Sequence, residues 1–141
     1  MKKSQRLLLL LALLMVPVVH ATSLPEFELT GRTSWQLGQL MVNGIPFVID
    51  QQTRFKGGLN EDDLGGTWVD LEGVVQDGWR YVREVEAIDE GDEMELEGPI
   101  ERGRMWGYST SDDSLAPFEG RWLELECRFD GMRLSHCRED D

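Results

Sequence analysis

The segment GTWVDLEGVVQDGWRYVREVE, residues 66–86, decides the fold. Its first half alternates apolar and polar residues through Val69–Glu72, which is the two-residue period of a strand with one buried face. Asp77-Gly78 follows, and both residue types readily adopt the positive φ that a two-residue hairpin turn requires. A second arm of mixed polar and apolar residues comes after the turn. The segment therefore predicts a β-hairpin.

The same order of residues returns near the end of the chain, in GRWLELECRFDGMRLSHCRE, residues 120–139. This copy again has Gly-x-Trp, an alternating arm and an Asp-Gly turn, here at Asp130-Gly131. The strands expected to open each unit also match, because Phe27–Gly31 and Met94–Gly98 share the order aromatic or Met, Glu, Leu, x, Gly. Beyond the first residues, no window keeps apolar residues at helical spacing for three turns. The sequence predicts an all-β protein, a small OB-like or open β-barrel built from two related β-units.

The two units are expected at about 27–88 and 94–139. The first contains Asn43-Gly44, the strongest short hairpin signal, and Pro46 just after it should lie at a sheet edge or bulge because it cannot donate to a ladder. The second unit has a shorter middle with no evident counterpart of this hairpin, so we expect Arg104–Tyr108 to form one strand. Whether the units share one core is not apparent from the sequence.

The N-terminal residues have the three parts of a secretory signal peptide. Basic residues at Lys2, Lys3 and Arg6 precede the apolar run Leu7–Val19, and a small-x-small cleavage site ends at Ala21. The apolar run is shorter than the roughly 20 residues that cross a bilayer. We therefore expect a signal helix over residues 1–21, and a single β-domain over residues 22–141 that is periplasmic or secreted and not inserted in the membrane. An uncleaved N-terminal anchor is the alternative.

The chain is strongly acidic, with 14 basic and 27 acidic residues and a net charge of −13. Removal of residues 1–21 would take away three basic residues and no acidic one, which gives −16. A surface of this sign repels phosphate backbones and anionic lipid heads, so nucleic acid is excluded as a partner. It is compatible with basic proteins or divalent cations, or serves solubility alone.

The two cysteines, Cys127 and Cys137, lie on opposite arms of the second hairpin. In an oxidising compartment they predict a disulfide. A two-residue turn at Asp130-Gly131 would set Cys127 opposite Leu134 and place Cys137 on the other face of the ribbon. A β-bulge at Ser135-His136 would return Cys137 to the face of Cys127 as its diagonal neighbour.

The first unit resembles the DUF5666 family of exported bacterial β-domains. The resemblance covers about half of the chain that follows the signal peptide, and the second unit departs from it in the middle. It implies a small barrel-like β-domain and no catalytic residue, ligand or reaction. The matching segments, in order, are Phe27–Gly31, Val42–Gly44, Asp50–Phe55, Leu64–Gly66, Val69–Gly73, Asp77-Gly78 and Val82-x-x-Val85.

Motifs for nucleophilic catalysis or phosphate binding are not evident. Beyond the signal peptide the chain has one His, His136, which stands between Ser135 and Cys137 on an expected strand, where neighbouring side chains point to opposite faces. A surface or structural role suits it better than a catalytic one. The glycine pairs lack the Lys-Ser/Thr continuation of a phosphate loop. We therefore assign no catalytic residue and no cofactor.

Metal binding by His and Cys fails on number, because no four-ligand zinc cluster can be assembled. Carboxylates do gather in the connector Asp89–Glu93 and at Asp62-Asp63, where they offer the hard oxygen ligands that Ca²⁺ prefers. Neither spacing matches an EF-hand loop, and a solvated charged linker is the simpler interpretation. We assign no metal ligand, and calcium binding by the connector stays open.

Tryptophan gives the one indication of a binding surface. Trp68 and Trp122 occupy the same place in the two hairpins, and strand alternation puts them on the face that carries Asp70 and Glu72, or Glu124 and Glu126. A rigid aromatic beside carboxylates suits contact with a polypeptide or a sugar ring. Trp35, Trp79 and Trp106 would extend this surface. The alternative is that all the indoles fill the core.

These observations support an exported, non-enzymatic binding or accessory module with a protein or glycan partner in the cell envelope. The alternatives are a purely structural envelope protein with no ligand and a carboxylate-based hydrolase. Exposed indoles favour the first, buried indoles the second, and a cleft with two facing carboxylates the third. The identity of the partner and the oligomeric state do not follow from the sequence.

Overall fold

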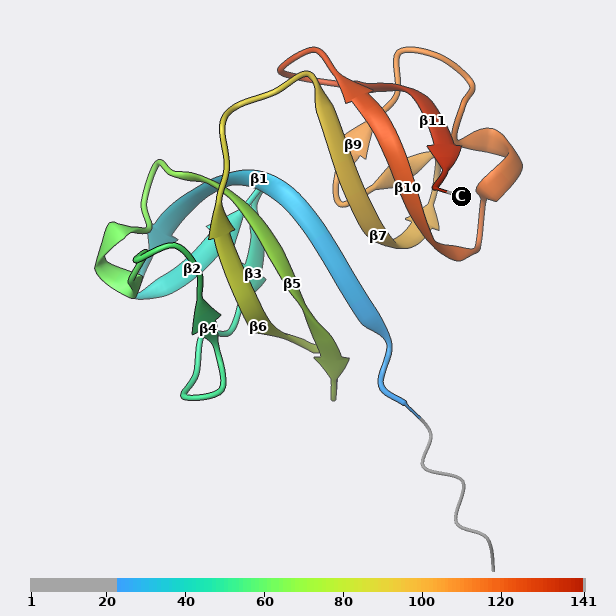
Figure 1. Cartoon of the computed structure of the whole chain (residues 1–141). Coiled ribbons are helices and arrows are strands. Elements are labelled where there is room, and N and C mark those ends of the chain that lie inside the picture. Colours follow the sequence, from blue (N-terminus) through green and yellow to red (C-terminus); the bar gives the residue numbers. More distant parts are fainter. Residues whose placement is uncertain (1–22, 141) are drawn as a thin grey trace, which may run out of the picture.

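The structure, a computed structural model, describes residues 23–140 and is all-β, with an open sheet and two short 3₁₀ turns (Figure 1). The expected signal helix lies outside the described residues. Within them, no helix is long and apolar enough to span a membrane. The strands are β1 (Glu26–Gln36), β2 (Gln39–Val42), β3 (Ile45–Phe47), β4 (Arg54–Phe55), β5 (Trp68–Gln76), β6 (Trp79–Ala87), β7 (Glu93–Glu101), β8 (Arg104–Met105), β9 (Tyr108–Ser109), β10 (Trp122–Phe129) and β11 (Leu134–Glu139); the 3₁₀ turns are η1 (Glu61–Asp63) and η2 (Ala116–Phe118).

The main sheet has the strand order β11-β10-β7-β1-β5-β6-β4, and β1 and β7 lie at its centre. The long strand β1 also pairs with β2, and β2 pairs with β3, so one end of β1 leaves the main sheet and begins a second ladder. β8 and β9 form a matching short ladder that starts from β7. The first unit contributes β1 to β6 and the second contributes β7 to β11, and the units meet where β1 pairs with β7.

The register of strand pairing supports a duplication of one β-unit. Leu29 on β1 lies opposite Leu71 on β5, and Leu96 on β7 lies opposite Leu125 on β10. These are the positions that the sequence repeat equates. β1 and β7 run antiparallel, and the pair at their crossing is Leu29 with Leu96 itself. The two units are therefore arranged around an approximate two-fold axis through this pair.

The second unit does have a counterpart of the Asn43-Gly44 hairpin, and the expectation of a single strand over Arg104–Tyr108 was wrong. β8 ends at Met105, the chain turns at Trp106-Gly107, and β9 returns. Trp106 has φ of 50° and Gly107 of 78°, close to the 51° and 74° of Asn43 and Gly44. Positive φ is costly for a tryptophan, so the dipeptide gave no turn signal. Burial of the indole offsets that cost.

The two units share one hydrophobic core. Phe27 and Phe47 of the first unit contact Trp106 of the second, with ring centroids 5.6 and 5.8 Å from that of the indole. The indole rests on Gly98, where an added Cβ would lie 2.8 Å from its Nε1. The two equivalent turns also meet directly, because the Asn43 side-chain amide donates to the Trp106 carbonyl at 2.6 Å.

The disulfide between Cys127 and Cys137 is present, but it is reached by a different register from the expected one. The turn of the second hairpin is shifted by one residue. The Asp130 amide donates to the Arg133 carbonyl at 3.2 Å, so Gly131 and Met132 form the turn and Phe129 pairs with Leu134. The Asp130 carboxylate accepts hydrogen bonds from the amides of Met132 and Arg133 within this turn. A bulge on β11 is confirmed, but it lies at His136-Cys137 and sets Cys137 beside Cys127 instead of diagonal to it.

The first hairpin follows expectation. Gln76 pairs with Trp79 across Asp77-Gly78, whose φ values are 52° and 78°. Its return strand also carries a bulge, because Glu72 pairs with Glu84 and Gly73 with Val82, leaving Arg83 as the extra residue. Pro46 lies on β3, which pairs only with β2 among the named strands, so its edge position is also confirmed.

Candidate binding face

One face of the main sheet is covered by carboxylates because the polar positions of five neighbouring strands fall in register. Side chains two residues apart share a face of a strand, and paired residues on adjacent strands stand side by side. A first row crosses the sheet from β6 to β10, each member paired with the next: Glu84, Glu72, Glu28, Glu97 and Glu124.

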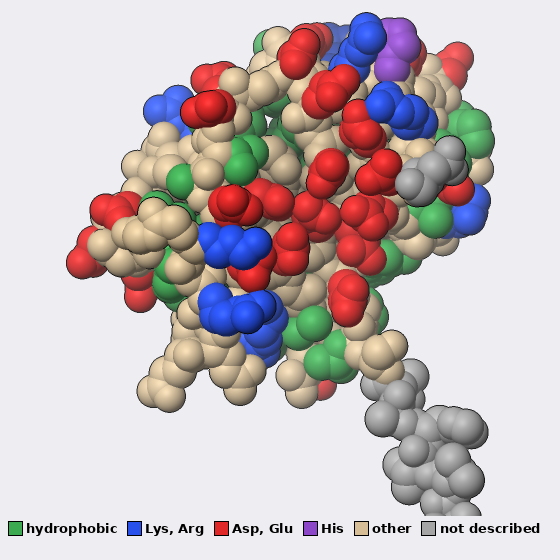
Figure 2. All heavy atoms as spheres, in the orientation of Figure 1, with side chains coloured by type: hydrophobic (Ala, Val, Ile, Leu, Met, Phe, Trp, Pro, Cys, Tyr) green, Lys and Arg blue, Asp and Glu red, His purple; other side chains and the backbone are tan. Residues whose placement is uncertain are grey.

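A second row lies one step along the strands. Glu86 pairs with Asp70, Asp70 with Thr30, and Glu95 with Glu126. The Thr30 hydroxyl donates to the Glu95 carbonyl at 3.4 Å, so Thr30 completes the row between the two units. We call these two rows the carboxylate face. In Figure 2 its Asp and Glu side chains form a band across the middle of the molecule.

Basic side chains neutralise the two ends of the carboxylate face and leave its centre uncompensated. At the β6 end, Lys56 Nζ lies 2.5 Å from Glu84 and Arg54 Nη2 lies 3.1 Å from it. At the β11 end, Arg138 pairs with Glu126. Within residues 23–140, no ion pair reaches the central carboxylates, which are Glu28, Asp70, Glu72, Glu95, Glu97 and Glu124.

Partial burial, together with nearby like charges, raises the pKa of three of the central carboxyl groups, Glu28, Asp70 and Glu97. Partial burial is the first cause of the rise in the pKa of Glu28 to about 9, followed by the nearby charge of Asp70 and by a hydrogen bond with it. Burial also raises the pKa of Asp70 to about 6, although its hydrogen bond with Glu28 opposes the rise. Glu28 is therefore protonated at neutral pH and donates to Asp70, so the pair carries a single negative charge.

Asp70 is less well satisfied than its partner. Its Oδ1 atom is buried and has no hydrogen-bond partner among the described residues. A carboxylate oxygen in this state is costly unless a donor or cation reaches it. The hollow beside it is lined by Thr30, Asp70, Ile88, Glu93, Met94, Glu95 and Glu126 and has a volume of about 430 Å³.

Two sets of central carboxylates are close enough to share a cation. The oxygens of Glu28, Asp70 and Glu72 lie within 4.8 Å of one another, and so do those of Glu28, Glu95 and Glu124. An all-oxygen set of this kind is the type that Ca²⁺ prefers. Among the described residues, the connector Asp89–Glu93 and the pair Asp62-Asp63 form no such group. The carboxylates that gather in space thus differ from those that gather in the sequence.

The two tryptophans predicted for the binding surface are in equivalent registers but unequal surroundings. Trp68 pairs with Arg32 and Trp122 with Pro99, which places them at opposite ends of the carboxylate face. Trp122 is 39% exposed and is held in place because its Nε1 donates to the Glu26 carbonyl at 2.8 Å. Trp68 is half-buried against Phe129, so it contributes more to packing than to the surface.

The other indoles do not extend an aromatic platform as a group. Trp106 is buried in the shared core, with its Nε1 donating to the Glu97 carbonyl, so the idea that it joins the surface was wrong. Trp35 and Trp79 are exposed, and the Trp35 Nε1 donates to the Leu64 carbonyl. The exposed aromatic at the carboxylate face is Trp122, together with the hollow it forms with Leu24, Pro25, Glu26 and Glu97.

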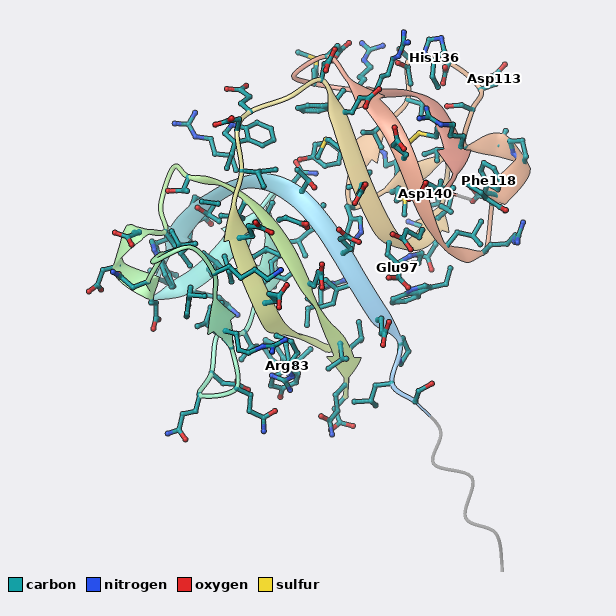
Figure 3. All side chains as sticks on the ribbon, viewed as in Figure 1. Arg83, Glu97, Asp113, Phe118, His136 and Asp140 are labelled. Atoms are coloured by element: carbon teal, nitrogen blue, oxygen red, sulfur yellow. A yellow bond between two sulfur atoms is a disulfide. The ribbon has the colours of Figure 1, made fainter. Side chains whose placement is uncertain are left out.

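Sequence reasoning placed Asp70, Glu72, Glu124 and Glu126 on the correct face but missed the residues between them. Glu28, Glu95 and Glu97 come from β1 and β7, and they become neighbours of the predicted residues because β1 pairs with β5 and β7 pairs with β10. The pairing of β1 with β7 then joins the two sets. Figure 3 shows the Glu97 side chain on β7, between β1 and β10. The sequence signal available for these residues was the alternation of apolar and polar residues in Phe27–Gly31 and Met94–Gly98.

His136 does not form a catalytic triad with its neighbours. The Ser135 hydroxyl lies 3.2 Å from His136 Nδ1, and an oxygen of Asp112 lies 4.0 Å from the same nitrogen. A triad needs the nucleophile and the acid on opposite ring nitrogens. His136 is exposed on the β11 strand, far from Glu97 in Figure 3.

Comparison of the chain with protein-family models, with curated proteins and with solved structures finds no match.

Proposed function

We propose that the protein is an exported, non-enzymatic binding module that uses the carboxylate face to bind a basic segment of a protein partner in the cell envelope. The observation that carries this proposal is the set of central carboxylates that have no counter-ion among residues 23–140. Like charges opposite one another on a sheet are destabilising. Lysine and arginine side chains of a partner would relieve that repulsion on binding.

Trp122 gives such a partner a second type of contact. Its indole is partly exposed and anchored at the end of the face, beside Glu26 and Glu97. A cationic side chain over this ring would gain a cation–π interaction, typically about 0.5–1 kcal/mol at an exposed site. A basic polypeptide therefore suits the face better than a neutral glycan, which would leave the carboxylates uncompensated.

Export rests on the predicted signal peptide and is supported by the Cys127–Cys137 disulfide, which is typical of oxidising compartments. The resemblance of the first unit to the DUF5666 family also stays a prediction. It is compatible with an exported β-domain that lacks a catalytic site.

A carboxylate-based hydrolase is the second candidate, because Glu28 has the raised pKa of a general acid and lines a hollow of about 340 Å³ with Glu26, Glu72 and Glu97. A retaining glycosidase holds its two carboxyl groups about 5–5.5 Å apart on either side of the scissile bond. Glu28 instead shares its proton directly with Asp70. This arrangement engages the acid within the protein and favours the binding function.

The test is calorimetric titration of the chain without residues 1–21 with a lysine-rich decapeptide. A face variant carries Glu72→Gln, Glu97→Gln and Glu124→Gln. A control variant carries Glu61→Gln, Asp89→Asn and Glu90→Gln, which remove the same charge from exposed positions away from the face. We expect the face variant to lose about tenfold or more in affinity, or about 1.4 kcal/mol, and the control to change little.

Equal losses in the two variants would show that only net charge matters and would contradict the proposal. Absence of binding by the wild type would also contradict it. Trp122→Ala should weaken binding a few-fold without changing the salt dependence, because it removes no charge. Turnover of a glycoside by the wild type, lost in Glu28→Gln, would favour the hydrolase instead.

A further inference from the structure

Away from the carboxylate face, residues of the two units line a small cavity that is open to solvent and has a different chemistry. It has a volume of about 250 Å³ and lies where β3 and β6 of the first unit meet the β7–β9 region of the second. It shares no residue with the carboxylate face. Its lining residues are Ile45, Arg80, Pro99, Glu101, Arg104, Trp106 and Gly107.

Arg80 is the unusual member of this cavity. Its guanidinium lies over the Trp106 ring, 5.3 Å from the centroid, and is partly buried. Burial lowers the pKa of Arg80, although a guanidinium stays charged at any physiological pH. Among the arginines of residues 23–140, it is the one that is partly buried and has neither an ion pair nor a hydrogen bond from its side chain.

A shortage of carboxylates does not explain why Arg80 has no ion pair. Acidic residues outnumber basic ones 27 to 14 in the chain, and Arg83, three residues along β6, pairs with Asp50 at 3.3 Å. Even Glu101, which lines the same cavity, makes no ion pair with Arg80. Arg80 therefore lines the cavity without a charge partner among the described residues.

The other walls define what the cavity would accept. Arg104 supplies a second cation and is oriented by its hydrogen bond to the Gly107 carbonyl at 3.2 Å. The lining contains two arginines and one carboxylate, Glu101, so its net charge is +1 in an acidic protein. Ile45 and Pro99 add apolar surface. The volume is slightly below the usual range of about 300–1,000 Å³ for small-molecule sites, so a compact group would fill it.

We propose that this cavity binds the carboxylate of a compact ligand, with Arg80 as the main anchor and Arg104 as a second donor. A guanidinium offers two parallel N–H groups to a carboxylate, and Trp106 holds that fork in place. A monoanion matches the net charge of the lining, whereas a phosphate or sulfate dianion would be repelled by Glu101 and by the acidic protein as a whole. Ile45 and Pro99 would contact the apolar part of the ligand.

Such a carboxylate could belong to a sugar acid or to the C-terminus of a peptide, and titration can distinguish them. The probes are glucuronate and N-acetylalanine, with glucose and N-acetylalanine amide as uncharged analogues. The readouts are the NMR signals of the Arg80 Nε–H and the Gly107 amide. We expect saturable shifts with a Kd of about 1–10 mM for a charged probe and none for its uncharged analogue. The tighter charged probe identifies the source.

Three variants complete the test. Arg80→Gln should weaken binding about tenfold or more, as loss of a charge-assisted pair requires. Glu101→Gln should strengthen binding about three- to tenfold, because it removes the competing carboxylate. Arg102→Gln is the matched control, since this exposed arginine lies outside the cavity lining and should leave the Kd unchanged.

The gain expected from Glu101→Gln cannot arise from misfolding, so the proposal stays testable even if Arg80→Gln unfolds the protein. Absence of saturable shifts up to about 50 mM, or equal shifts from the uncharged analogues, would overturn the proposal. So would binding that survives in folded Arg80→Gln, or a Glu101→Gln variant that binds no more tightly.

Discussion

At the scale of single residues, Glu28 concentrates the electrostatic cost of the fold. It lies in the first row of the carboxylate face, between Glu72 on β5 and Glu97 on β7. Partial burial and the nearby charge of Asp70 disfavour an ionised Glu28, so its carboxyl group keeps a proton in the folded protein. Its pKa of about 9 compares with 4.5 for an ordinary glutamate.

This shift predicts that stability falls as the pH rises. Between pH 4.5 and about 9 the unfolded chain releases the Glu28 proton while the folded chain keeps it, and Asp70 adds the same effect between 3.8 and about 6. Glu28→Gln mimics the protonated acid. We expect it to stabilise the protein at pH 8 by about 1 kcal/mol, after allowance for solvent screening of a partly exposed group.

The same variant should have almost no effect at pH 4, where Glu28 is protonated in both states. Urea denaturation across this pH range measures the effect of Glu28→Gln on the free energy of unfolding at pH 4 and at pH 8. The matched control is Glu90→Gln, which removes an exposed acid of the connector and should leave the pH profile unchanged. A wild type whose stability is flat or rises between pH 5 and 9 would contradict the prediction.

Residue-level prediction from sequence succeeded where local alternation decides the outcome. The face of Asp70, Glu72, Glu124 and Glu126 follows from the two-residue period of their own strands. It failed for Glu28 because its neighbours Glu72 and Glu97 come from β5 and β7, and no local pattern states which strands pair across the molecule. The difference between Trp68 and Trp122 was also invisible, since it arises from packing of Trp68 against Phe129.

At the scale of elements, turn chemistry explains which hairpins could be read from the sequence. Asn43-Gly44 and Asp77-Gly78 accept positive φ easily, and both hairpins were predicted and turn at these residues. Asp130-Gly131 carried the same signal, yet the Asp130 side chain accepts from the Met132 and Arg133 amides and the turn lies one residue later, at Gly131-Met132. Trp106-Gly107 carried no signal because tertiary burial, rather than local preference, stabilises that turn.

The disulfide should compensate for the irregular register of the β10–β11 hairpin. It closes a loop with a sequence separation of 10 between Cys127 and Cys137, and both cysteines are buried in the core. A crosslink of this size typically stabilises a protein by about 2–4 kcal/mol. We expect Cys127→Ala with Cys137→Ala to lose about this amount in urea denaturation.

The reduced wild type serves as the control, because it lacks the crosslink but keeps both side chains in the core. If it matches the double variant, the loss belongs to the crosslink and not to a cavity. A change below about 0.5 kcal/mol in both would show that hairpin pairing alone fixes this edge of the sheet.

At the scale of the whole molecule, duplication did not give two independent domains. The aromatic cluster joins Phe27 and Phe47 of one unit to Trp106 of the other, and β1 and β7 pair directly. Each unit therefore completes the core of its partner around the approximate two-fold axis. The sequence revealed the repeat but not this sharing, because a repeat is equally compatible with two separate cores.

A shared core predicts that neither unit folds alone. Residues 23–90 without the second unit would expose Phe27 and Phe47 to water and leave one edge of β1 unpaired. We expect this fragment to show no cooperative thermal transition by circular dichroism, because short domains that lose part of their core fall below the stability threshold.

The control is the intact chain with a protease site inserted between Glu90 and Gly91, in the exposed connector. After cleavage its two pieces should remain associated and melt together, since the core and the β1–β7 pairing are retained. A cooperative transition of the isolated fragment would show instead that the first unit has a sufficient core of its own, and it would leave the contact between the units as an interface between two finished domains.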